Sequence, residues 1–306
     1  MNFKCVNCGS NGYFEVAKKC RDSEEFKILR CKKCNLVQLD HMPEILDDQN
    51  FYDADQQVKN CISDLTLQQM KTNAKEDNHR RYEMIKPHCS AEMKLLEIGC
   101  GYGFFLELLQ AEGIYAEGIE IGEERRRIAN KRCNNRVQAI NLLADKTLEH
   151  RDKFDIVCLF QVLEHISNPV IFLKNINRLF LKDSSLVFIE IPNADDQMLN
   201  QSRGYFDFYW QRAHLMYYNK QTVKMILEKA GYYIEDIFGI QRYGLENSFN
   251  WIINQVPQLK KPAYHSSGGI KWLEKYYKDT IEENLTADTL IIIARKDSSG
   301  QLGLDR

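Results

Sequence analysis

The feature that most constrains the fold is a short apolar run that leads directly into a glycine-rich turn and then into a helix. Residues 94–98 form the apolar run, and glycines follow at the alternate positions 99, 101 and 103. The amphipathic segment 104–109 begins at the next residue. Glycine tolerates left-handed backbone and lets main-chain N–H groups approach a ligand closely. The pattern therefore predicts a strand, turn and helix of a doubly wound α/β sheet, with a ligand at the turn.

An acidic residue in front of the turn narrows the choice of ligand. Dinucleotide-binding proteins also use glycine-rich turns, but Glu97 lies two positions before Gly99. A carboxylate at that position would repel a phosphate and attract the ammonium group of a methionine. S-adenosylmethionine fits this turn better than a dinucleotide. The residues expected to bind its methionine end are Glu97, Gly99, Cys100, Gly101 and Gly103.

Two later segments supply the rest of the expected cofactor site. Residues 115–121 form a short alternating strand that ends at Glu120, and such an acid can accept hydrogen bonds from both ribose hydroxyls. Residues 154–160 form a further apolar strand. The side-chain amide of Asn141 can accept a hydrogen bond from the amino group of the adenine. The remaining cofactor candidates are Ile121, Asn141, Leu142, Gln161 and Val162.

Taken together, these motifs resemble those of the class I S-adenosylmethionine-dependent methyltransferases. EIGCGYG at 97–103 is similar to their first motif, Glu120 to their ribose-binding acid, and FDIVCLFQVLEHISNP at 154–169 to their fourth-strand motif. The resemblance extends from about residue 70 to about residue 240, with a last strand near residue 290. It implies a doubly wound, Rossmann-like α/β fold with a seven-stranded methyltransferase sheet.

The periodicity of the sequence predicts the other elements. Asn219 is a suitable helix N-cap, Gly231 a suitable residue after a helix end, and Pro87 a helix terminator. Helices are expected at 65–85, 122–132, 168–181 and 219–230, and further strands at 186–191, 233–238 and 289–294.

Two CxxC pairs near the N-terminus predict a metal site. Cys5 and Cys8 form the first pair, Cys31 and Cys34 the second, and twenty-two residues separate the pairs. Four thiolates at this spacing are typical of a zinc ribbon, and they leave no coordination position for water. The zinc is therefore expected to be structural. Basic residues around the ribbon are compatible with RNA docking or with a solvated charged surface.

Composition indicates a compact enzyme and excludes several classes of protein. The chain has 306 residues, 44% of them hydrophobic, and a formal net charge of −2, which argues against nucleic acid or an anionic membrane as partner. No apolar run approaches the ~20 residues that cross a bilayer, and the N-terminus does not resemble a signal peptide. A cytoplasmic location is expected.

The expected domain organisation has four parts. They are a zinc ribbon at 1–40, a linker and helix at 41–90, a methyltransferase domain at 91–296 with insertions at 192–218 and 241–287, and a disordered tail at 297–306. Residues 36–62 are linker-like in composition, and the aromatic stretch within the first insertion is expected to be a loop.

The first insertion carries the catalytic candidates. A zinc ribbon joined to this core, with His214 and Tyr217 in a His-x-x-Tyr segment, resembles deoxysugar C-methyltransferases and relatives in capsule and O-antigen biosynthesis. The resemblance implies that His214 is the general base on a nucleotide-linked sugar, with Tyr217 and His165 as further candidates. Ala213 stands where that family usually has glutamate, and the C-terminal region is shorter. Methylation of an oxygen on a sugar or another small hydroxyl compound is therefore at least as well favoured.

The segment Leu163-Glu164-His165 is shared with the quinone-biosynthesis O-methyltransferases. That resemblance implies a divalent ion held by acidic residues there, but Gln161 occupies the position of the first acid. Glu164 and His165 are therefore expected to have a structural or supporting role.

Three functional hypotheses follow. The first is methyl transfer to a small, sugar-like acceptor. The second is an RNA or protein methyltransferase that docks its target through the basic ribbon, and the third is a non-catalytic subunit that binds S-adenosylmethionine. The acceptor, the methylated atom and the oligomeric state are not determined by the sequence.

Overall fold

A seven-stranded sheet forms the larger of two sheets in the described residues. The structure is a computed structural model and describes residues 3–43, 64–144, 152–258, 264–266 and 270–297. The strand order is β10-β11-β8-β7-β4-β5-β6. These strands are β4 (Lys94–Ile98), β5 (Tyr115–Ile119), β6 (Val137–Gln138), β7 (Phe154–Phe160), β8 (Leu181–Pro192), β10 (Tyr232–Ile240) and β11 (Thr289–Lys296). The predicted α/β class and seven-stranded sheet are confirmed.

The chain divides into two compact units. The glycine-loop unit comprises residues 43–160, 174–188 and 295–306, and the ribbon unit comprises residues 1–42, 161–173 and 189–294. The division separates the predicted cofactor residues around the glycine turn from the predicted catalytic histidines.

In the glycine-loop unit, β4 lies between two parallel neighbours. Leu95 of β4 pairs with Ala116 of β5 on one side and with Ile156 of β7 on the other. The strand order reverses at β4, which is where open α/β sheets bind ligands at the carboxyl ends of their strands. The predicted glycine turn follows β4 and therefore lies at this position.

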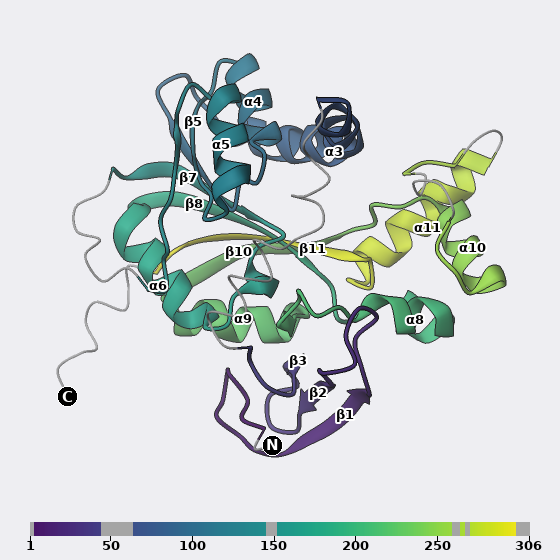
Figure 1. Cartoon of the computed structure of the whole chain (residues 1–306). Coiled ribbons are helices and arrows are strands. Elements are labelled where there is room, and N and C mark those ends of the chain that lie inside the picture. Colours follow the sequence, from purple (N-terminus) through teal and green to yellow (C-terminus); the bar gives the residue numbers. More distant parts are fainter. Residues whose placement is uncertain (1–2, 44–63, 145–151, 259–263, 267–269, 298–306) are drawn as a thin grey trace. The chain divides into compact units, whose positions relative to one another are not determined.

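Three helices pack on this part of the sheet or on one another (Figure 1). They are α3 (Asp64–Ile85), α4 (Phe104–Ala111) and α5 (Glu123–Arg132). Leu67, Tyr102 and Ile128 form a buried cluster, which Met70 and Phe104 extend. A 3₁₀ turn, Lys86–His88, contains Pro87 and follows α3, as the sequence predicts.

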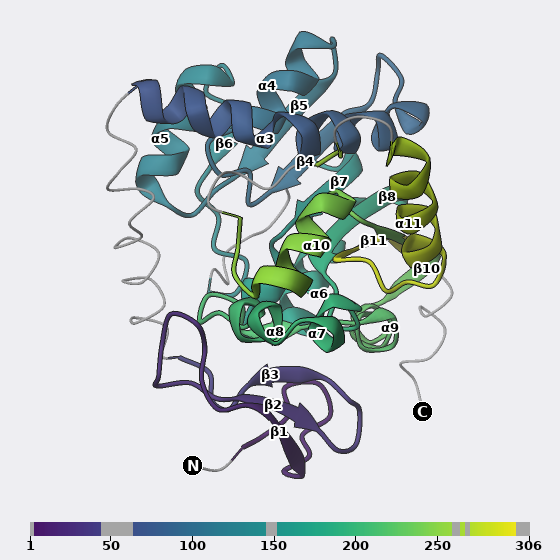
Figure 2. The same cartoon turned by 90° about the vertical axis from the view of Figure 1, so that its right-hand side faces the viewer.

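The ribbon unit contains a second sheet of four strands in the order β1-β2-β3-β9, of which Figure 2 labels β1, β2 and β3. Its strands are β1 (Tyr13–Ala17), β2 (Ile28–Cys31), β3 (Val37–Leu39) and β9 (Met216–Tyr217). Residues 37–39 lie within the ribbon predicted at 1–40, and despite their linker-like composition they form β3, which is fully buried and pairs antiparallel with both β2 and β9. Residues 44–62 lie outside the described residues. The ribbon and the His214 segment thus share one sheet.

The first insertion is not the expected aromatic loop. It contains two short helices, α7 (Met198–Gln201) and α8 (Arg203–Tyr209), followed by β9. The Ser202 hydroxyl accepts a hydrogen bond from the Tyr205 main chain and so caps α8. This cap, rather than the aromatic composition, explains why the segment is helical. The second insertion also contains two helices, α10 (Leu245–Asn254) and α11 (Lys271–Glu283).

The remaining helices agree with the sequence to within a few residues. They are α6 (Pro169–Phe180) and α9 (Lys220–Lys229). The side chains of Asn219 and Thr222 form a capping box at the start of α9, and Gly231 adopts φ +81° after its end. Among the described residues, no helix is both long enough and apolar enough to cross a membrane.

Candidate functional site

The glycine turn after β4 has the backbone geometry that the sequence predicts. Gly99, Gly101 and Gly103 have φ values of +73°, +54° and +75°, a region that favours glycine. The main-chain N–H groups of Gly99 and Cys100 both donate to the carbonyl of Ile119, at 2.8 and 3.1 Å. The turn is therefore fastened to the end of β5.

Two of these glycines have different surroundings. A Cβ atom on Gly103 would lie 2.9 Å from the Cys133 sulfur, because the turn packs closely against α5. A Cβ atom on Gly101 would meet no atom within 4 Å. The backbone at Gly101 thus borders open space into which a ligand can fit. The Cys100 side chain packs instead against Gly118 on β5, where an added Cβ would approach its sulfur to 2.7 Å.

Glu97 is the acid at the end of β4, and it is only 5% exposed. Its Oε2 atom is buried and makes no hydrogen bond within the described structure. Burial raises the pKa of Glu97 to about 7, the charge of Arg81 opposes this rise, and the charge of Glu120 adds to it. A buried carboxylate with an unused oxygen is suited to receive a cationic group such as a methionine ammonium.

Glu120 is held in place by the main chain on both sides. Its two carboxylate oxygens accept hydrogen bonds from the N–H groups of Gly101, at 2.9 Å, and Gly122, at 2.7 Å. Each oxygen retains capacity for a further hydrogen bond, which suits a ribose diol. The next residue, Ile121, is 58% exposed and offers an apolar surface beside this acid.

The other predicted cofactor residues are less clearly arranged. The Asn141 side-chain oxygen accepts hydrogen bonds from its own loop, at Leu143 and Ala144, and Leu142 is buried. Gln161 and Val162 belong to the ribbon unit, and Gln161 has a left-handed φ of +58°. Such backbone strain in a residue other than glycine is often found at functional sites.

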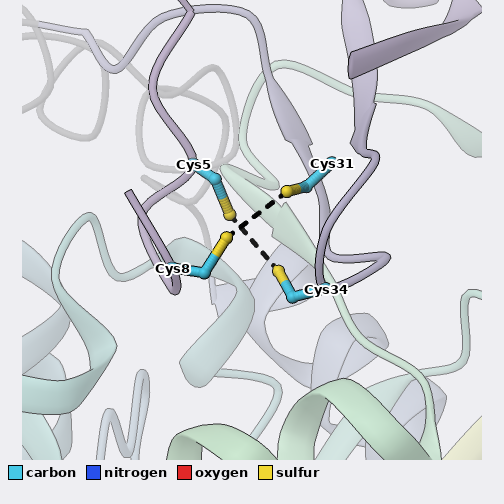
Figure 3. A group of neighbouring side chains, drawn as sticks. All are labelled: Cys5, Cys8, Cys31 and Cys34. Atoms are coloured by element: carbon cyan, nitrogen blue, oxygen red, sulfur yellow. Dashed lines mark hydrogen bonds between the residues drawn. The ribbon is translucent and has the colours of Figure 1, made fainter. Parts of the chain in front are cut away.

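The four predicted metal-binding cysteines converge on one point (Figure 3). The sulfur atoms are 3.4 Å apart for Cys5 and Cys34 and 3.5 Å apart for Cys8 and Cys31. Four sulfurs around a tetrahedral zinc, each ~2.3 Å from the ion, are separated by comparable distances. The cysteines therefore fit zinc in both donor type and spacing.

The backbone around the cysteines supports this arrangement. Gly9 and Asn35, each one residue after a CxxC pair, have φ values of +69° and +62°. Their N–H groups donate to the carbonyls of Cys5 and Cys31, at 2.8 and 3.0 Å. Both pairs thus close the same kind of tight turn, which brings two sulfurs to one side.

The predicted catalytic histidines lie together in the ribbon unit. Their rings meet edge to face, with centroids 4.9 Å apart. The Nδ1 atom of His165 lies 2.7 Å from the carbonyl oxygen of Ala213. Because a carbonyl only accepts hydrogen bonds, this nitrogen carries the proton. The other ring nitrogen, Nε2, lies 3.9 Å from a carboxylate oxygen of Glu164.

His214 contacts the side-chain amide of Gln211. The amide nitrogen lies 2.8 Å from Nε2 and 3.2 Å from Nδ1 of the ring. Burial lowers the pKa of His214 well below its ordinary value, and the positive charges of His165, Arg21 and Arg242 lower it further. The imidazole is therefore neutral at neutral pH, and one of its ring nitrogens carries a lone pair.

Tyr217, a further predicted catalytic candidate, is buried and hydrogen-bonded to the main chain of Gln211. Its side chain is 1% exposed. Its hydroxyl accepts a hydrogen bond from the Gln211 N–H at 2.7 Å and donates one to the Gln211 carbonyl at 2.9 Å. This geometry fits a clamp on the main chain of Gln211.

Glu164, His165 and His214 also have the donor types of a metal site. Their donor atoms all lie within 4.8 Å of one another, and Glu164 is 1% exposed. A histidine that donates its second ring nitrogen to a main-chain carbonyl, as His165 does, is a common arrangement around metals.

Sequence reasoning missed two residues of this cluster, Gln211 and Arg21. They are 190 positions apart, yet an Arg21 Nη atom donates to the Gln211 side-chain oxygen at 2.7 Å. No motif marks either residue. The first insertion as a whole is expected to be functional from its aromatic residues and from its place after a strand of the sheet.

The fold is a doubly wound α/β domain with a glycine turn at the point where the strand order reverses. Residues 69–237 match the family model described as methyltransferase domain, which is more than half of the chain. The chain therefore belongs to the methyltransferase domain family.

Curated relatives are ubiquinone biosynthesis O-methyltransferases. The protein from Glaesserella parasuis is 29% identical over 108 residues, which is 33% of this chain and 45% of that protein. The protein from Aeromonas salmonicida is 24% identical over 191 residues, which is 56% of this chain and 77% of that protein. The chain thus spans about 45% of the length of the first of these relatives.

A solved structure shows the same fold. It is the magnesium protoporphyrin IX methyltransferase from Synechocystis with bound S-adenosylhomocysteine. It has a TM-score of 0.51 and 10% sequence identity, and the match covers 83% of this chain and all of that one. At this identity the likeness concerns the fold alone.

Proposed function

We propose that this protein transfers a methyl group from S-adenosylmethionine to a hydroxyl group of a small acceptor. The observation that carries the proposal is the neutral, partly buried imidazole of His214, beside His165, in a chain of the methyltransferase domain family. Such a group can take the proton that the hydroxyl loses.

The cofactor residues have separate roles in this proposal. Glu97 binds the methionine ammonium, the turn at Gly99–Gly103 accommodates the methionine backbone, and Glu120 binds the ribose hydroxyls. The open space at Gly101 and the main-chain hydrogen bonds to Glu120 support these assignments. Ile121, Asn141 and Leu142 are assigned to the adenine, with Gln161 and Val162 as further contacts.

The reaction is a single displacement. The acceptor oxygen forms a bond to the methyl carbon as the carbon–sulfur bond of the sulfonium breaks, and the sulfur keeps the electron pair. The hydroxyl proton moves to a ring nitrogen of His214, which later releases it to water. The products are S-adenosylhomocysteine, the methyl ether and one proton. The enzyme contributes proximity, orientation and the base.

The finer proposal is a sugar or nucleotide-linked sugar as acceptor, in carbohydrate biosynthesis. Tyr205, Tyr209 and Tyr217 continue an aromatic row toward His214, with centroid separations of 5.5 to 6.0 Å between neighbours. Aromatic ring faces suit a sugar ring. They suit an aromatic ring equally well, and the curated relatives are named as ubiquinone biosynthesis O-methyltransferases. A polyhydroxylated aromatic compound is therefore the second candidate acceptor.

A metal-assisted version of the same transfer is favoured by one observation, the clustered donor atoms of Glu164, His165 and His214. A divalent ion there would bind the acceptor hydroxyl and lower its pKa. Methyl transfer that survives exhaustive chelation, with the ribbon intact, would exclude this version.

The zinc in this proposal is structural and is held by Cys5, Cys8, Cys31 and Cys34. Their convergence and the two matching turns support the assignment. A closed set of four thiolates has no position for a substrate. Metal analysis of the purified protein, with Cys34→Ser as the comparison, tests it.

The experiment that tests the function supplies methyl-labelled S-adenosylmethionine with a cell extract and separates the products by size. We expect label in small molecules, and we expect His214→Ala to lose most of the turnover while it retains cofactor binding. Panels of nucleotide sugars and of catechols then distinguish the two acceptor classes. Unchanged turnover in His214→Ala would exclude this residue as the base.

Label in RNA or protein would instead support a macromolecular acceptor that docks on the basic ribbon. A complete lack of transfer with every acceptor panel, while the cofactor binds, would support a non-catalytic subunit that binds S-adenosylmethionine.

A further inference from the structure

The segment between β1 and β2 of the zinc ribbon reaches the loop that carries His214. Arg21, in this segment, makes three contacts there. Its main-chain N–H donates to the Trp210 carbonyl at 2.8 Å, and one guanidinium nitrogen donates to the Phe208 carbonyl at 3.1 Å. The guanidinium also lies 4.2 Å from the centre of the Phe208 ring. Although Arg21 is exposed, these contacts hold its side chain in one position.

The remaining guanidinium contact determines how the Gln211 amide is turned. The second terminal nitrogen of Arg21 lies 2.7 Å from Gln211 Oε1. An arginine only donates hydrogen bonds, and therefore the amide must present its oxygen to Arg21. The NH₂ group then faces the opposite way, toward the imidazole of His214, at 2.8 and 3.2 Å from its two ring nitrogens.

The main chain of Gln211 is also fixed by its surroundings. The Tyr217 hydroxyl on β9 accepts a hydrogen bond from the Gln211 N–H and donates one to the Gln211 carbonyl. Strand β9 in turn pairs with β3 of the ribbon. On the next residue, the N–H of Arg212 donates to a carboxylate oxygen of Asp22 at 2.9 Å. With the main chain held in this way, the amide orientation is the main remaining freedom of Gln211.

We propose that Arg21 is a positioning residue that acts on His214 through Gln211. It fixes the amide of Gln211 with its N–H donors toward the imidazole, and so fixes the orientation of the ring. The zinc ribbon therefore contributes a positioning residue to the acceptor site in addition to supporting the fold. This inference rests on the proposed role of His214.

The charged and titratable groups around His214 come from several elements. They are Arg21 from the ribbon, Glu164 and His165 from the turn Leu163–His165, Tyr217 from β9 and Arg242 after β10. Arg21 is linked to the ring through a hydrogen bond to the side-chain amide of Gln211. Its removal is therefore expected to act differently from removal of the others.

The test is a double-mutant cycle of Arg21→Met and Gln211→Met in the full-length, zinc-loaded protein. If Arg21 acts through Gln211, we expect each single variant to lower kcat about tenfold. We also expect Arg21→Met to add almost nothing when Gln211 is already methionine. Cofactor affinity should stay constant, and Arg21→Lys should recover part of the activity because lysine can still donate one hydrogen bond.

Arg203→Met is the matched control. Arg203 also lies over a phenylalanine ring, that of Phe206, and pairs with Asp207 on α8, but it is 77% exposed and is not linked to Gln211. We expect wild-type kcat from this variant. Fully additive losses in the cycle, or equal losses in the Arg203→Met control, would overturn the proposal.

A second readout does not depend on turnover. The NMR resonance of the His214 ring Cε1–H, assigned by its loss in His214→Asn, should shift in Arg21→Met and stay in place in Arg203→Met. In the Gln211→Met background, the addition of Arg21→Met should no longer change the chemical shift of this resonance. If the ring resonance shifts as expected but turnover does not need His214, the base assignment is refuted and the positioning contact remains supported. A ring that does not respond to Arg21 would refute the positioning contact itself.

Discussion

At the scale of single residues, the proposed cofactor site combines backbone freedom with two buried carboxyl side chains, Glu97 and Glu120. Gly101 and Gly103 both adopt left-handed backbone, but their surroundings differ, since Gly101 borders open space and Gly103 packs against Cys133. Glu97 is buried with an oxygen that makes no hydrogen bond. Burial of an unpaired carboxylate costs stability, and a cationic ligand can offset that cost.

Glu97 therefore makes stability and cofactor affinity depend on pH in opposite directions. Its pKa is raised from 4.5 to about 7 in the folded protein. Between these values the folded state holds a proton that the unfolded state has lost, so stability falls as pH rises through this window. The full shift corresponds to about 3 kcal/mol. Above pH 7 the carboxylate is ionised and should bind the ammonium group of S-adenosylmethionine most tightly.

We expect Glu97→Gln to melt at a higher temperature than the wild type at pH 8, to match it more closely at pH 5, and to bind the cofactor weakly at both. Thermal melts and calorimetric titrations at the two pH values measure this. Glu117→Gln, on the adjacent strand and partly exposed, is the control and should change neither property. A wild-type affinity that does not change between pH 5 and pH 8 would contradict the assigned role of Glu97.

At the scale of elements, local signals placed most boundaries correctly. The predicted strands at 94–98 and 154–160 coincide with β4 and β7, and the predicted glycine turn leads into α4. These segments have strong periodicity and clear end signals, which act locally. The helices of the two insertions were not predicted, because α7 and α8 are short and depend on caps and packing.

The N-cap of α9 allows a direct test of such a local signal. The Asn219 side chain accepts a hydrogen bond from the Thr222 main chain at 2.9 Å, and the Thr222 hydroxyl accepts one from the Asn219 main chain at 2.9 Å. We expect Asn219→Ala to lower the free energy of unfolding by about 1 kcal/mol, as measured by urea denaturation. Asn219→Asp keeps the acceptor oxygen and should remain close to the wild type. Equal losses in both variants would show that the cap is not the cause.

At the scale of the whole molecule, the ribbon is joined to the segment that carries His214. β3 pairs with β9, the Leu39 N–H donates to the Leu215 carbonyl at 3.1 Å, and Lys229 of α9 donates to the Asn7 side chain at 2.7 Å. Zinc that stabilises the ribbon should therefore also stabilise β9.

Removal of zinc is expected to have a regional effect. Zinc binding to four thiolates contributes on the order of 10 kcal/mol to the folding of such small modules. In Cys34→Ser, we expect amides of residues 28–39 and 215–217 to lose protection from hydrogen exchange by at least ~10-fold, because this zinc-dependent free energy is lost. Amides of β4 and β5 should keep their protection. Unchanged protection at 215–217 would show that the ribbon and β9 are energetically independent.

The sequence by itself determined the doubly wound class, the glycine turn with Glu97 and Glu120, the two CxxC pairs and most of the strands and helices. These features depend on neighbours within a few residues, so their physical causes can be read from short stretches of chain. Only the tertiary structure showed that Val37–Leu39 pairs with Met216–Tyr217, that Tyr217 clamps Gln211, and that Arg21 reaches the amide beside His214. Those contacts join residues up to 190 positions apart, and their hydrogen bonds have no local periodicity that could reveal them.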